Sequence, residues 1–141
     1  MVEYTLNERI NVLGLSEDRV KIVRKLKYES IWLDNKVIDN KKFREETIEV
    51  DKIVGICNRM DDANDWIDLL GLLHKMRNFS DYEKYHEQHF DLILMEPEKY
   101  AIPLPSLINH NGKFYILGEG KHRLTIAKCL GGKKAKVSIG F

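Results

Sequence analysis

The stretch that decides the fold is YILGEGKHRLTIAKCLGG, residues 115–132. It begins with apolar residues typical of a strand, and residues 123–130 have the composition of a helix, which the following glycine pair should stop. Gly118 and Gly120 lie between the two segments, in a turn that also holds one acidic and three basic side chains. The question is whether this strand-to-helix turn is a binding site or only a sharp corner with a charged surface.

The turn has the features of an anion site. Backbone N–H groups at the start of a helix converge on one point and carry about half a positive charge, and glycine lets a ligand approach the backbone closely. Arg123 can hold a phosphate or a carboxylate through paired hydrogen bonds, Lys121 adds a point charge, and His122 adds a donor or a general acid and base. The pattern predicts a phosphate-binding corner, and the alternative is a tight turn with three solvated cations.

The composition is that of an ordinary soluble chain. Its 141 residues suit one domain with a short appendage, and 23 basic against 22 acidic residues leave a net charge of +1. This balance does not favour nucleic acid or a membrane over the whole surface, so a basic site has to be local. No apolar run approaches the ~20 residues that span a bilayer, and the N-terminus is too polar for a signal peptide. We therefore expect a cytoplasmic protein with no membrane partner.

The cysteines and histidines give little support for a metal site. Cys57 and Cys129 lack zinc or disulfide spacing and are expected as buried thiols. Two clusters have ligand-like spacing: His86 and His89 with Glu83 and Glu87, and the group of Asp61, Asp62 and Asp65. The first lacks the H-E-x-x-H pattern, and the second stands where acidic residues cap a helix. We therefore expect no metal site.

Local patterns predict the remaining elements. Ser16 caps a helix that should run to about Trp32, and the Asn111-Gly112 pair should join two short strands. Along the rest of the chain we expect a strand at 47–54, a helix at 61–79, a helix at 81–95 opened by the capping box of Ser80 and Glu83, an edge-like or short strand at 102–108, and strands at 113–117 and 134–139. Trp32 and Trp66 are expected in the core.

This order of elements predicts an α+β (α/β) fold. A small mixed β-sheet with flanking helices should occupy residues 46–141, and residues 1–45 should form an N-terminal helical extension.

The glycine turn resembles the ParB/sulfiredoxin-like superfamily, which includes the ParB-like N-terminal nuclease or nucleotide-binding domain. In that superfamily a G-x-x-R element opens a helix after a strand and binds the phosphate groups of a nucleotide. The run from Gly120 to Arg123 matches this element, and the run from Glu119 to Arg123 is similar to the D-G-H-H-R form of other members. The strand over 48–53 and the I-P-L-P segment also stand where the family has its first two strands. The resemblance covers residues 46–141 and implies a ParB/sulfiredoxin-like fold there.

The chain departs from the family at one position of the motif. Sulfiredoxins carry a reactive cysteine there, ParB proteins and related free-serine kinases carry a glutamate, and this chain has Lys121. The departure argues against a sulfiredoxin reductase. Candidate catalytic roles fall to Glu119, which would position a metal or a water, and to His122, which would act as acid and base.

Two functions follow from the resemblance. The first is a nucleotide-binding ParB-like domain that acts as an NTPase, a phosphotransferase or a nuclease in DNA maintenance, with ATP or CTP and Mg²⁺. The second is a non-catalytic switch or interaction module that binds a nucleotide or the phosphates of a nucleic acid. The phosphate-binding residues would be Gly118, Gly120, Lys121, His122 and Arg123, with Arg59 as a secondary candidate. A phosphate-bearing ligand is the expected partner, and nucleic acid and a homodimer stay open.

Overall fold

The computed structural model describes residues 4–59, 62–73 and 87–141. Six strands of these residues form one mixed sheet in the order β1-β3-β5-β4-β6-β2. They are β1 (Glu29–Ile31), β2 (Phe43–Glu49), β3 (Ile53–Cys57), β4 (Ser106–His110), β5 (Lys113–Ile116) and β6 (Lys134–Gly140). β1, β3 and β5 run parallel, β4 is antiparallel to β5 and parallel to β6, and β2 pairs antiparallel with β6.

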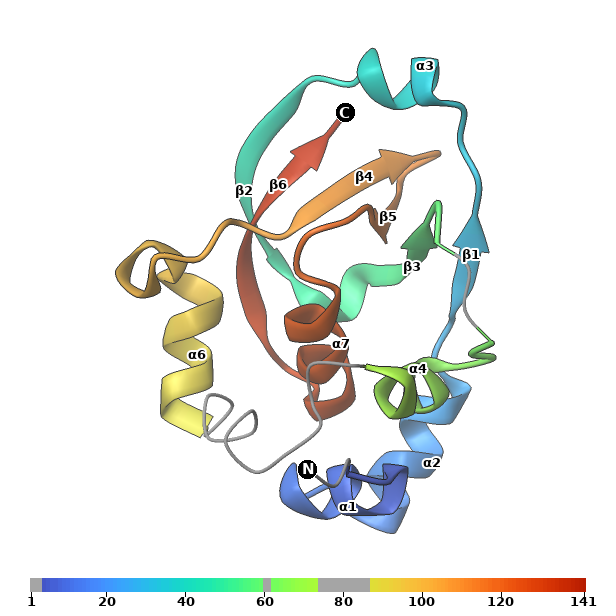
Figure 1. Ribbon diagram of the computed structural model, residues 1–141, viewed down its shortest axis with the longest axis vertical. Coiled ribbons are helices and arrows are strands. Elements are labelled where there is room, and N and C mark those ends of the chain that lie inside the picture. The colour runs from blue at the N-terminus through green and yellow to red at the C-terminus, as the bar shows by residue number, and fades with distance from the viewer. Residues whose placement is uncertain (1–3, 60–61, 74–86) are drawn as a thin grey trace.

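Helices flank this sheet. Those of the described residues are α1 (Leu6–Val12), α2 (Glu17–Lys25), α3 (Asn35–Asp39), α4 (Trp66–Leu72), α6 (Glu87–Met95) and α7 (Lys121–Leu130), with the 3-10 turns η1 (Val50–Lys52) and η2 (Pro97–Tyr100). Figure 1 shows α1, α2, α4 and α7 gathered below the sheet, and α3 at the top in the segment that leads from β1 to β2. The expected mixed sheet with flanking helices is therefore confirmed.

The main core lies between one face of the sheet and the helices α2, α4, α6 and α7. Trp66 of α4, Phe90 of α6 and Leu124 of α7 are all fully buried in it. Burying an apolar side chain of this size stabilises the fold by roughly 1.5–3 kcal/mol. A smaller cluster around Ile108 and Tyr115 lies on the other face, where Ile38 of α3 packs against it. Both faces of the sheet are therefore at least partly covered.

The helix that the sequence predicts after Ser16 ends earlier than expected. Ser16 caps α2 as expected, but α2 stops at Lys25, and the chain then forms β1 instead of a helix reaching Trp32. Two contacts with Trp66 account for this: its indole donates to the carbonyl oxygen of Lys27 at 2.8 Å, and its ring meets Tyr28 edge to face. Residues 1–45 thus supply helices, and also β1 and the first residues of β2.

The alternating run at 47–54 is not one strand. β2 ends at Glu49, η1 turns the chain, and β3 begins at Ile53 in the opposite half of the sheet. Lys128 of α7 fixes this turn by donating to the carbonyl oxygens of Asp51 and Ile53, both at 2.6 Å. Val50 and Ile53 are both buried although three positions separate them, a spacing that would put them on opposite faces of a single strand.

β4 is short, as one of the two expectations has it, but it is a central strand and not an edge strand. Pro103 and Pro105 precede the strand, which begins at Ser106, so its ladders with β5 and β6 need no proline N–H. The hairpin is confirmed, with φ of 54° at Asn111 and 78° at Gly112. The predicted last helix and last strand are present as α7 and β6.

The predicted helix at 61–79 is shorter where the structure describes it. α4 begins at Trp66 behind the N-cap Asp65, and Arg9 of α1 donates to the carbonyl oxygens of Leu70 and Leu73 at its end. Ser80, Glu83 and the start of the 81–95 helix lie outside the described residues. Trp66 is buried as expected, whereas Trp32 is 62% exposed and the expectation that it is a core residue is wrong.

Candidate functional site

The turn between β5 and α7 depends on one of its two glycines. Gly120 directly precedes α7 and has φ 91° and ψ 6°, in the left-handed region. A Cβ at this position would overlap Pro105, the residue before β4. At Gly118 a Cβ would meet no described atom within 4 Å. Gly120 is therefore required by both conformation and packing, whereas Gly118 leaves open space beside the chain.

Backbone hydrogen bonds hold this turn against β4. Ser106 N donates to the carbonyl oxygen of Glu119 at 3.0 Å, and Leu117 N donates to the carbonyl oxygen of Ser106 at 2.8 Å. Gly118 and Gly120 also form a bridge pair within the turn. The backbone N–H and C=O groups of Ser106 therefore both hold the turn, and its conformation is set before any ligand binds.

A side chain from the end of β3 reaches the same turn. Arg59 Nη2 donates to the carbonyl oxygen of Gly118 at 3.3 Å. Asn58 redirects the chain just before it, with a left-handed φ of 55°. The structure thus brings the secondary candidate Arg59 to the glycine turn from a segment far away in the sequence.

Arg123 lies at the turn but beneath its surface. The residue is 8% exposed, and its Nη2 donates to the carbonyl oxygen of Pro103 at 2.7 Å. This bond holds the segment before β4 against the first turn of α7. Contact between Arg123 and a phosphate stays a prediction, because part of its guanidinium already serves the backbone.

The charge at the start of α7 has one sign. Its first turn, which the structure describes in full, holds no acidic residue, and basic residues occupy the first three positions. Leu124 N donates to the carbonyl oxygen of Gly120 at 2.9 Å, so three amides precede the hydrogen-bond pattern of the helix itself. Lys121 and His122 are half-buried, and Glu119 is exposed on the turn. The helix end and the cations together favour an anion at this spot.

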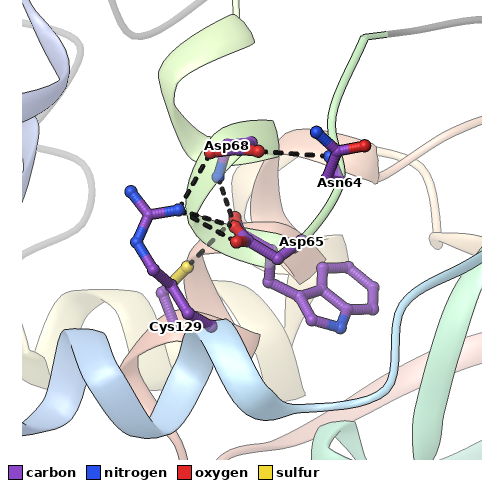
Figure 2. A network of polar contacts seen from close by, with 6 residues as sticks. Asn64, Asp65, Asp68 and Cys129 are labelled. Carbon is purple, nitrogen blue, oxygen red and sulfur yellow. Dashed lines mark hydrogen bonds and ion pairs between the residues drawn. The ribbon is translucent and has the colours of Figure 1, made fainter.

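The start of α4 shows the opposite arrangement (Figure 2). Arg24 Nη1 lies 2.9 Å from the carboxylate of Asp65 and 2.9 Å from that of Asp68. Asp65 also accepts a hydrogen bond from Asp68 N at 2.8 Å, and Asp68 accepts one from Asn64 N at 3.2 Å. The hydrogen bond from Arg24 lowers the pKa of Asp68. Acids of the chain itself thus complement this helix end, whereas α7 presents cations.

Metal-ligand clusters are not found among the described residues: no group of three or more His, Cys, Asp or Glu side chains could hold an ion. His89 packs instead against Tyr100, with its Nδ1 3.5 Å from the hydroxyl. Asp65 caps α4, as the capping interpretation predicts. His86, Glu83 and Asp61 lie outside the described residues.

The far end of α7 carries two groups with strongly shifted pKa values. Burial lowers the pKa of Lys128 to about 8 and raises that of Cys129 to about 12. The Lys128 ammonium lies 5.4 Å from the ring centre of Trp66, and Arg19 donates to the carbonyl oxygens of Cys129 and Lys128 at 2.9 and 3.2 Å. Shifted groups often mark functional sites, but the Lys128 ammonium donates to backbone carbonyls inside the core, and Arg19 caps the end of the helix. We interpret them as structural.

The glycine turn lies at the carboxyl ends of parallel strands. Ile31 pairs with Cys57 between β1 and β3, and Ile56 pairs with Ile116 between β3 and β5. The segments that follow these strands therefore emerge at the same edge of the sheet. In open α/β sheets this edge is where ligands bind.

Fold and site together define a mixed α/β domain with a glycine turn at one sheet edge. No protein-family model matches the chain, and neither the curated proteins nor the solved structures contain a match to it. The resemblance to the ParB/sulfiredoxin-like superfamily is thus carried by the motif residues alone. Among the helices that the structure describes, none has the length and apolar character needed to cross a bilayer.

Proposed function

We propose that the chain binds the phosphate groups of a nucleotide at the glycine turn, as a domain of the ParB/sulfiredoxin-like kind. One observation carries the proposal: two distant segments meet there, since Arg59 from the end of β3 contacts Gly118 and α7 begins at Lys121 with three successive cations. Amides of a helix start together with cationic side chains suit a phosphate. Gly118, Gly120, Lys121 and His122 form the proposed contact surface, with Arg59 and Arg123 at its sides.

A catalytic role of this site would rest on Glu119 and His122. The two flank Gly120 and Lys121 at the start of α7, so a carboxylate and an imidazole stand beside the proposed phosphate position. The proposed reaction is then hydrolysis or transfer of a phosphoryl group of ATP or CTP with Mg²⁺, or nuclease cleavage. A non-catalytic nucleotide switch is the second candidate, and the bond from Arg123 to Pro103 favours it, because that guanidinium is partly engaged.

A thermal-shift panel tests the binding. The ligands are ATP, CTP, GTP and inorganic phosphate, each with Mg²⁺. A ligand at ~100 times its Kd should raise the free energy of unfolding by about 2.7 kcal/mol, which is a shift of several degrees in Tm. If no ligand of the panel raises the Tm, the proposed function is wrong.

Three variants locate the site. Arg59→Ala and Lys121→Ala should each weaken nucleotide binding by roughly tenfold, because each removes one charge-assisted contact of about 1.4 kcal/mol. Lys21→Ala removes an exposed lysine from α2 and serves as the matched control. Isothermal titration gives the three Kd values, and an equal loss in the control would point to non-specific charge attraction.

Product analysis separates the two candidate functions. Wild type, Glu119→Gln and His122→Ala are incubated with the nucleotide that binds, with Mg²⁺, and the products are resolved by chromatography. Turnover that both variants lose supports catalysis at the turn. Binding without any product assigns the switch.

A further inference from the structure

We propose that Trp32 is the ring-stacking contact of this site, so that the ligand is a mononucleotide with its base on the Trp32 indole and its phosphates at the glycine turn. The inference rests on the proposed function and narrows its ligand from any phosphate-bearing molecule to one that carries a flat ring. Trp32 is 62% exposed, the highest value among the exposed large hydrophobic side chains of the described residues. Tryptophan is highly buried on average in folded proteins, and it is enriched among residues that dominate binding energy.

Extended past the strand ends, the strand register puts Trp32 level with the glycine turn. Ile31 lies opposite Cys57, so the next residue, Trp32, is level with Asn58. Ile56 lies opposite Ile116, so Gly118 is level with Asn58 from the other side. Neighbouring strands are ~4.8 Å apart, which puts the backbones of Trp32 and Gly118 about 10 Å from each other, with β3 between them. A mononucleotide can span this separation.

Asn58 and Arg59, which follow β3, form hydrogen bonds to the segment around Trp32 on one side and to the glycine turn on the other. They thus fix the spacing between Trp32 and the turn. Asn58 N donates to the carbonyl oxygen of Ile31 at 2.9 Å. Its side chain accepts from Leu33 N at 2.7 Å and donates to the carbonyl oxygen of Leu33 at 3.0 Å, so it brackets Trp32. The next residue, Arg59, donates to Gly118. Two consecutive residues thus connect the backbone around Trp32 with the glycine turn.

The side chain of Trp32 belongs to the same face of the sheet as α7. Ile31 and Leu33 pack against the small cluster on the opposite face. Side chains alternate along an extended chain, so Trp32 between them points to the face that carries the main core and α7. Ser30, on that same face of β1, is also exposed. The indole therefore stands on an uncovered part of the helix-bearing face, beside the edge at which α7 begins.

A ligand with a flat ring would gain a stacking contact at Trp32. Stacking on an indole accepts any base, because every base has a π face. Arg59 lies between the indole and the turn in the strand order and can contact the phosphate next to the ribose, which joins the base to the phosphates. A phosphate compound without a ring would bind at the turn and leave Trp32 exposed. Ligands with and without a ring should therefore differ in their effect on Trp32.

Fluorescence distinguishes these ligands directly. The chain has two tryptophans, and Trp66 is fully buried, so quenching by a bound base reports on Trp32. The full chain is titrated with ATP, CTP and inorganic tripolyphosphate, each with Mg²⁺. ATP and CTP should quench the emission saturably, and tripolyphosphate should bind without quenching. In Trp32→Leu the nucleotides should no longer quench.

Affinities give the second readout. Trp32→Leu should weaken ATP and CTP binding by roughly 5- to 100-fold and leave the Kd of tripolyphosphate within about twofold of wild type. Trp32→Phe should retain a large part of the nucleotide affinity. Phe43→Leu removes an exposed aromatic ring from β2 at the other edge of the sheet and is the matched control, with both affinities unchanged.

The outcomes separate this inference from the proposed function. If tripolyphosphate and nucleotides bind equally well and Trp32→Leu changes neither, the role of Trp32 is overturned and the phosphate site stands. If neither ligand type binds, the proposed function fails and the inference fails with it. If a ten-nucleotide single strand binds through Trp32 and the mononucleotides do not, the assignment of a mononucleotide is overturned.

Discussion

Gly118 and Gly120 stand in one turn and meet different surroundings. Gly120→Ala would place a Cβ against Pro105 at a φ of 91°, so we expect a loss of ~1–3 kcal/mol in the free energy of unfolding. Gly118→Ala meets open space and should change it by less than ~0.5 kcal/mol. Urea unfolding of the two variants and wild type measures both. Equal losses would contradict the tight contact with Pro105.

The local structure of the glycine turn, between a strand and a helix, could be predicted from the sequence. Glycines, cations and a helix start stand within six positions, so local rules were sufficient to place them together. The sequence could not predict that Arg123 is buried, because the carbonyl oxygen that accepts its hydrogen bond belongs to Pro103, twenty residues away. Nor could it predict the exposure of Trp32, which follows from where β1 ends and from the clamp by Asn58.

At the scale of the element, the start of α4 allows the contribution of an N-cap hydrogen bond to be separated from that of an ion pair. Asp65→Ala removes both the N-cap bond to Asp68 N and the ion pair with Arg24, and should lower the free energy of unfolding by ~1–2 kcal/mol. Asp65→Asn keeps a capping oxygen and should lose less than half of that. Urea unfolding checks both variants, with the exposed Asp62→Ala as control. An Asn variant as unstable as the Ala variant would show that the ion pair dominates.

Some elements with local signals were predicted, but α1 was not, although Thr5 and Glu8 form a capping box at its start; elements defined by distant partners were not predicted. The cap of α2, the Asn111-Gly112 hairpin and α7 each carry their own signal in a few consecutive residues. The division between β2 and β3 depends on β6 and on Lys128, which hold η1 from the other end of the chain. The central position of β4 likewise depends on β6, which no pattern around residue 106 encodes.

At the scale of the whole molecule, one hydrogen bond ties the N-terminal strand to the middle of the sheet. Tyr115 Oη donates to Glu29 Oε2 at 2.6 Å, from β5 to β1. Gly55 of β3 lies between the two residues in the register, and a Cβ there would overlap the backbone of Glu29. The tyrosine can therefore reach across β3, and β1 is held by more than its short ladder.

This tie predicts an acid-dependent change in stability. The hydrogen bond from Tyr115, with the neighbouring Lys27, lowers the pKa of Glu29 from 4.5 to about 2. A carboxyl with a lowered pKa in the folded state stabilises the fold above pH 4.5, and that contribution is lost as the pH falls towards 2. Glu29→Gln should thus show a smaller drop in Tm between these pH values than wild type in thermal unfolding. Glu45→Gln, at an exposed position of β2, should keep the wild-type drop.

The pairing of β2 with β6 has a consequence for the nascent chain. Phe43 lies opposite Gly140, and Glu49 lies opposite Lys134, so β2 cannot pair until nearly the whole described chain has been synthesised. At ~5–20 residues per second, the ribosome leaves β2 without its partner for a time on the order of ten seconds. Unpaired strands of this length are prone to aggregate, and charged side chains along them oppose this. Arg44, Glu45, Glu46 and Glu49 therefore protect β2 while the chain is still being made.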